Sequence, residues 1–69
     1  MSDIEIIIEA IIEMDKPFRI TDLYIKLKQE HNIDDRKMIL EVLQDLLNNG
    51  VVNYLEISDN VWAYSSMFA

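Results

Sequence analysis

The chain has 69 residues, enough for one domain over residues 1–69, and no cysteine, which excludes disulfide bonds and thiolate metal sites. Apolar residues make up 51% of the composition, with one glycine and one proline, so a folded chain is expected and a disordered one is excluded. The net charge of −7 means that phosphate backbones and anionic membranes repel the molecule on average.

The first segment, from about Asp3 to Met14, is predicted to be a helix that Ser2 or Asp3 caps. Its inward stripe recurs at helical spacing and comprises Ile4, Ile7, Ile8 and Ile11. A run of isoleucines also favours a strand locally. Three glutamates four residues apart occupy a separate face, and this spacing favours the helix.

Pro17 ends this helix, because it moves the preceding residue out of the helical region. Residues 18–20 are predicted to be a short extended piece. Thr21 is the expected N-cap of a second helix that runs to about Glu30. Its apolar side is formed by Leu23, Ile25 and Leu27, and the chain turns at residues 31–32.

A third helix is predicted from a cap at Asp34 or Asp35 to about Asn48. Its inward stripe comprises Ile39, Val42, Leu43 and Leu46. Gly50 suits the left-handed position that ends a helix. Strands are expected over residues 51–57 and 61–65, joined by the turn residues 58–60. The order of helix, short strand, two helices and hairpin predicts the α+β class.

The spacing of Ile39, Leu43 and Leu46 before Gly50-Val51-Val52 resembles the winged-helix superfamily. The resemblance covers residues 3–66 and implies a winged helix-turn-helix, with three helices, a short strand and a C-terminal β-hairpin wing. Many winged helices bind DNA and many bind proteins, so the resemblance implies an architecture more than a function.

A narrower resemblance is to the dissimilatory sulfite reductase D family, small winged helices linked to an enzyme complex. Residues 17–23, 36–46 and 51–54 carry it. The hairpin of this chain is less polar than that family suggests, and its basic residues are fewer. The resemblance implies a third possible role, as an accessory subunit of a larger enzyme.

The distribution of cations argues against a nucleic-acid face. All six basic residues lie between residues 16 and 37, and residues 38–69 contain no Lys or Arg. DNA-binding winged helices place the third helix in the major groove and the wing on phosphates. A wing without cations lacks the main source of affinity for DNA. Nucleic acid is therefore a possible but disfavoured partner.

The start of the third helix is the one candidate patch for reading DNA. Arg36 and Lys37 lie there, and Gln44 follows on the outward arc of the same helix. Alternatively, Arg36 and Lys37 are ordinary solvated residues beside the acidic Asp34 and Asp35.

Candidate protein-binding residues lie on the third helix and the hairpin. Leu40 and Leu47 widen the apolar arc of the helix, either to meet a partner or to pack under the hairpin. Tyr54, Trp62 and Tyr64 make the hairpin aromatic, and alternation puts Trp62 and Tyr64 on one side of their strand. These rings could anchor a protein, stack on bases, or cover the core.

The first helix is a candidate dimer seam, because Ile6 and Ile12 flank its inward stripe. The alternative is that this helix is simply the central helix of a small core.

The sequence contains no pattern typical of an active site, and no cofactor, metal or small-molecule substrate is expected. His31 is the single histidine and is expected to be an exposed turn residue. Phosphate-loop and nucleophile-elbow patterns are absent. No segment reaches the ~20 apolar residues of a membrane span, and no signal peptide is recognisable. A cytoplasmic location is expected, or a nuclear one if the source is eukaryotic.

The sequence thus predicts a non-enzymatic winged-helix adaptor or regulator. Its expected partner is a protein or a second copy of the chain, bound through the third helix and an aromatic, acidic wing. The alternative is a dimeric DNA-binding transcription regulator that reads DNA with the start of the third helix.

Overall fold

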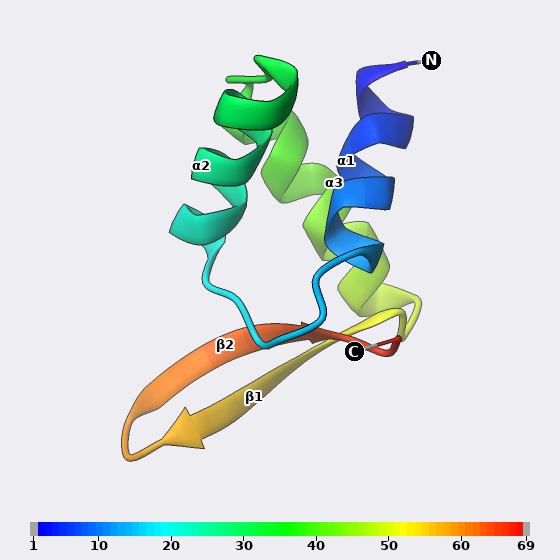
Figure 1. Cartoon of the computed structure of the whole chain (residues 1–69). Helices are drawn as coiled ribbons and strands as arrows, with labels where there is room; N and C mark the ends of the chain where they lie inside the picture. The colour runs from blue at the N-terminus through cyan, green and yellow to red at the C-terminus, as the bar shows by residue number, and fades with distance from the viewer. Residues whose placement is uncertain (1, 69) are drawn as a thin grey trace.

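The computed structural model describes residues 2–68, so the two ends of the predicted domain, Met1 and Ala69, lie outside the described residues. The elements are the helices α1 (Asp3–Ile12), α2 (Ile20–His31) and α3 (Arg36–Asn48), and the strands β1 (Val52–Ser58) and β2 (Val61–Ser66). Figure 1 shows the three helices side by side above the hairpin, whose tip extends past them. Three helices and a two-stranded antiparallel sheet place the described chain in the α+β class.

Helix α1 is capped by Ser2, whose hydroxyl oxygen accepts a hydrogen bond from the backbone N–H of Glu5 at 3.3 Å. The helix ends at Ile12, two residues before the predicted end at Met14. The N–H of Met14 donates to the carbonyl of Ile11 at 3.1 Å, a tight turn that breaks the α-helical pattern.

The predicted N-cap of α2 at Thr21 is wrong, because the N-cap is Arg19, two residues earlier, and the helix begins at Ile20. The backbone N–H of Arg19 donates to Asp22 Oδ2 at 3.0 Å, so the aspartate in the first turn reaches back to fix the helix start. At the other end Asn32 adopts φ +54°, a left-handed conformation that turns the chain toward α3.

Of the two possible caps of α3, the structure selects Asp35, whose Oδ1 accepts a hydrogen bond from the N–H of Met38 at 3.1 Å. Gly50 has φ +76°, which confirms the predicted left-handed position after the helix. The N–H of Gly50 donates to Leu47 and that of Val51 to Leu46, at 3.2 and 2.9 Å. This pair of bonds satisfies the last carbonyls of α3 before β1 begins.

Strand β1 lies one residue later than predicted, and β2 begins at the predicted residue 61 and extends one residue further. The strands pair antiparallel, with Tyr54 opposite Tyr64 and Glu56 opposite Trp62. The turn is made by residues 59–60, where Asn60 has φ +58°. The register shifts between Glu56 and Ser58, so β1 carries one residue more than β2 next to the turn.

The extended piece predicted over residues 18–20 is reduced to one bridging residue, because Ile20 already belongs to α2. Phe18 and Tyr64 exchange both backbone hydrogen bonds, each at 2.8 Å. Phe18 therefore occupies one edge of β2, and β1 occupies the other.

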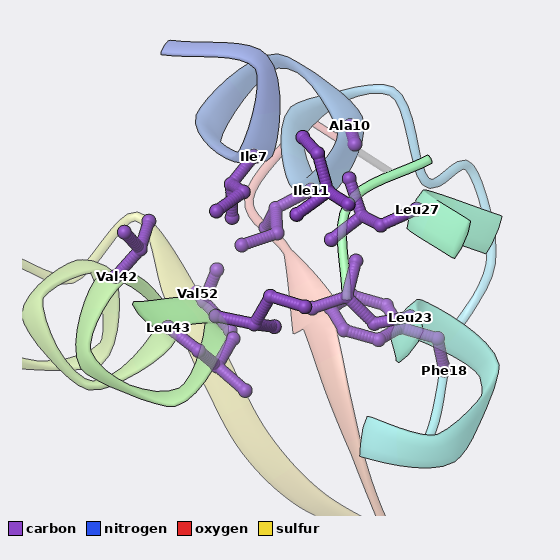
Figure 2. Close-up of a cluster of buried hydrophobic side chains, with 11 residues drawn as sticks. Ile7, Ala10, Ile11, Phe18, Leu23, Leu27, Val42, Leu43 and Val52 are labelled. Carbon is purple, nitrogen blue, oxygen red and sulfur yellow. The ribbon is translucent and has the colours of Figure 1, made fainter. Parts of the chain in front are cut away.

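The core lies between the helices and the base of the hairpin (Figure 2). Its fully buried large side chains are Ile7, Ile11, Leu23, Leu27, Ile39, Leu43 and Val52. Two predicted inward residues are exposed instead. Ile25 lies about 200° around α2 from Leu23 and so points to solvent. Ile4 lies in the first turn of α1, where half of its surface remains uncovered.

Candidate interaction surface

Four aromatic rings form a continuous row from the core to the surface of the hairpin. Ring centroids are 5.9 Å apart for Phe18 and Tyr64, 4.8 Å for Tyr64 and Tyr54, and 5.3 Å for Tyr54 and Trp62. Phe18 is buried at one end, whereas Tyr54 and Trp62 are 53% and 44% exposed. We call these four residues the aromatic row.

Strand pairing explains this row. Because side chains alternate across a strand, Tyr54 and its cross-strand partner Tyr64 share a face with Trp62. Cross-strand and diagonal neighbours on one face are within reach of large rings. Phe18 joins the row because its bridge to Tyr64 brings the segment between α1 and α2 against β2. The hairpin rings are thus held by a buried ring as well as by each other.

A hollow of about 300 Å³ lies between the start of α2 and the exposed face of the aromatic row. It is lined by Arg19, Ile20, Thr21, Tyr54, Trp62 and Tyr64. Among residues 2–68 no carboxylate forms an ion pair with the Arg19 guanidinium. The cation that the hairpin lacks in sequence is therefore supplied beside its rings by the residue before α2.

Burial raises the pKa of Tyr64 above its ordinary value of 10.0, and the neighbouring Tyr54 and Tyr24 add to the shift. The Tyr64 hydroxyl therefore stays neutral at physiological pH. The inner end of the hollow is aromatic and uncharged, and its charge comes from Arg19 at the rim.

A second hollow, of about 210 Å³, lies between α2 and the start of α3. The Arg36 guanidinium carbon lies 5.0 Å from the centroid of the Tyr24 ring, within the range of a cation–π contact. Lys28 Nζ lies 3.5 Å from Asp34 Oδ2 in the same hollow. Arg36, the first predicted DNA-reading residue, is thus in contact with an aromatic ring of its own chain.

The other predicted DNA-reading residues lie on the outer surface of α3. Lys37 is exposed at the start of the helix. Gln44 Nε2 donates to Asn48 Oδ1 at 3.3 Å, one turn further along the same helix. Neither residue lines the hollows described above.

The apolar candidates on the helices differ in exposure. Leu40 is 47% exposed, whereas Leu47 is half-buried against the core. On α1, Ile6 packs against the core and Ile12 is exposed. Leu40 and Ile12 are therefore available to a partner, while Leu47 and Ile6 are largely used inside the domain.

Sequence reasoning missed two exposed apolar residues of β1, Leu55 and Ile57. Period-two alternation puts Leu55 on the opposite face from Tyr54, whereas Ile57 lies at the register shift next to the turn. Met67 and Phe68, just after β2, are exposed as well.

Metal-binding clusters are absent from the described part of the chain. Within residues 2–68 no group of three His, Cys, Asp or Glu side chains comes together as a metal site. His31 is exposed at the end of α2. None of the helices over this range has the length and apolar character needed to cross a membrane.

Comparison with family models, curated proteins and solved structures gave no match for this chain.

Proposed function

We propose that the chain is a winged-helix domain. The order of elements supports this assignment: one helix, a bridging residue, two helices and a hairpin. In such a domain α2 and α3 form the helix-turn-helix unit, and β1 and β2 form the wing. Phe18 takes the place of the short first strand, since it bridges to β2 on the edge opposite β1.

We further propose that this domain is a non-enzymatic adaptor or regulator that binds another protein. Its main contact surface is the exposed part of the aromatic row, with Leu40 on α3 as a further apolar contact. Burial of rings such as Tyr54 and Trp62 supplies much of the energy of many protein interfaces. The single observation that carries the proposal is that these stacked rings are half exposed beside the Arg19 hollow.

The charge distribution favours a protein over a nucleic acid. The wing carries Glu56 and Asp59 and no cation, so it lacks the charged contacts that supply most of the affinity for phosphates. Stacked rings with one arginine suit an apolar anchor that carries an adjacent carboxylate.

Trp62 provides the test, because it is the single tryptophan of the chain. The wild-type protein and the Trp62→Ser variant are immobilised and exposed to extract from the source cells. Phe68→Ser is the matched control, since it removes an exposed ring that lies outside the aromatic row. A protein retained by the wild type and by Phe68→Ser should be lost with Trp62→Ser. When purified, that protein should also shift the Trp62 emission.

Retention of the same proteins by all three baits would contradict the adaptor proposal. If the retained protein is a subunit of an enzyme, the adaptor is an accessory subunit of that enzyme, which is the role implied by the narrower resemblance. The aromatic surface would be the same in both cases.

The second candidate is a dimeric DNA-binding regulator, favoured by the exposed Lys37 and by Arg36 at the start of α3. It predicts salt-sensitive binding of duplex DNA, measured by fluorescence anisotropy, that the double variant Arg36→Ala, Lys37→Ala abolishes. The adaptor proposal predicts no such binding at physiological salt. The anisotropy titration thus separates the two candidates.

A further inference from the structure

Strand β1 has an open edge. Its register pairs it with β2 alone, and Phe18 occupies the far edge of β2. In residues 2–68 no other segment pairs with β1. Figure 1 shows that the strand starts near the end of α3 and that its far half runs along the lower border of the molecule, away from the helices. The strand is seven residues long and contains no Lys, Arg or Pro, the residues that commonly protect exposed edges.

The bridge at Phe18 determines which groups of β1 are unpaired. Tyr64 directs both its N–H and its C=O toward Phe18, at 2.8 Å each. The backbone of its cross-strand partner Tyr54 therefore forms no hydrogen bond with the backbone of Tyr64. The N–H and C=O of Tyr54 point to the open edge instead. The same alternation turns the backbone groups of Glu56 outward and those of Leu55 toward β2.

We propose that the occupant of this edge is β1 of a second copy of the chain, paired antiparallel about a two-fold axis through Leu55. In this register Tyr54 of each copy lies opposite Glu56 of the other. The two pairs exchange four backbone hydrogen bonds in all. Each Glu56 carboxylate then lies beside a phenol and not beside the other carboxylate, which removes a like-charge contact.

In this arrangement the side chains of β1 in one copy are complementary to those of β1 in the other copy. The two Leu55 residues form the close, non-hydrogen-bonded pair at the axis, where Cα atoms are ~4.5 Å apart. Leu55 is 36% exposed, so pairing at the axis covers apolar surface that the single chain leaves open. A 69-residue chain without cysteine is also of the size that commonly gains support from an oligomer.

The proposed two-fold axis also determines where the aromatic rows of the two copies lie. A two-fold axis of this kind is perpendicular to the sheet, so both aromatic rows lie on the same face of one continuous sheet. The dimer would offer two equivalent ring surfaces to a partner. Because each chain carries −7, added salt should strengthen the pairing by screening the repulsion between copies.

Cysteine cross-linking tests the register directly, since the chain has no cysteine of its own. In Leu55→Cys the two thiols meet at the axis, within the Cα separation that a disulfide requires. In the control Asn53→Cys, on the same face, the two Cα atoms are four residue steps apart, ~14 Å, and cannot be bridged. Mild oxidation should convert Leu55→Cys to a covalent dimer at least ten times faster than Asn53→Cys.

Mass measurement by light scattering is the second test. The wild type should shift from 8.1 kDa toward twice that mass as its concentration rises. Glu56→Pro should remain monomeric, because proline removes an outward N–H that β2 does not use. Circular dichroism checks that the variant is folded. If it is not, Leu55→Lys gives the same test by placing two like charges at the axis.

A wild type that stays monomeric at all concentrations would overturn the proposal. The open edge of β1 would then be available only to a strand from another protein. Equal cross-linking rates for the two cysteine variants would overturn the register and with it the two-fold pairing. Neither result bears on the adaptor proposal, which depends on Trp62 and not on the edge of β1.

Discussion

Phe18 is the residue on which the relation between the helices and the hairpin depends, and its replacement gives the sharpest test of the fold. The side chain is buried, with 3% exposed, and its ring stacks on Tyr64. Its backbone forms the bridge to β2. Phe18→Ala removes the ring and keeps the bridge, since the hydrogen bonds are made by main-chain atoms.

The expected loss is large relative to the stability of so small a domain. Truncation of a buried phenylalanine to alanine costs about 3–5 kcal/mol. A chain of this length is expected to have a free energy of unfolding of about 3–10 kcal/mol. Phe18→Ala should therefore remove about 30% of the stability or more. Phe18→Leu keeps most of the volume and should cost about 1 kcal/mol.

Urea unfolding followed by circular dichroism and by Trp62 emission measures both quantities. Circular dichroism reports the helices, and the single tryptophan reports the hairpin. Both signals should move to lower urea together in Phe18→Ala, with Phe18→Leu between it and the wild type. A loss below about 1 kcal/mol in Phe18→Ala would refute the role assigned to this ring.

Three further predictions concern the helix ends and the aromatic row. Gly50→Ala should cost about 1 kcal/mol and lower Tm by about 4–8 °C, because φ is +76° while no atom lies within 4 Å of the added Cβ; Gly50→Asn should cost less. Asp35→Ala should lower the free energy of unfolding in urea by about 1 kcal/mol, because α3 loses its cap. Asp34→Ala removes only an exposed ion pair and should cost a few tenths of a kcal/mol, so equal losses would contradict the cap assignment. The raised pKa of Tyr64 stabilises the fold below pH 10, and this contribution is lost as pH rises through the folded pKa. Urea unfolding at pH 8 to 11 should show a smaller loss of stability in Tyr64→Phe than in the wild type; the same loss in both proteins would count against the partly buried hydroxyl as its cause.

Several features were predictable because they depend on residues close together in the chain. The positions of the three helices follow from apolar spacing and from Pro17, and the left-handed turn follows from Gly50. The lack of cations after Lys37 is a property of the sequence itself and holds for any fold. Helix ends were predicted less well: Thr21 is a typical capping residue, but the N-cap is Arg19, whose backbone N–H donates to the Asp22 carboxylate.

What only the tertiary structure decided is which surfaces remain open and what lies beside them. The bridge between Phe18 and Tyr64 joins residues 46 positions apart, and it aligns the rings, brings Arg19 to the hairpin and turns the Tyr54 backbone outward. Local periodicity also could not distinguish the exposed Leu40 from the half-buried Leu47, because both lie on the shoulder of one helical arc. The physical reason is common to all these cases: propensity and spacing act over a few residues, whereas burial and edge pairing depend on contacts between distant segments.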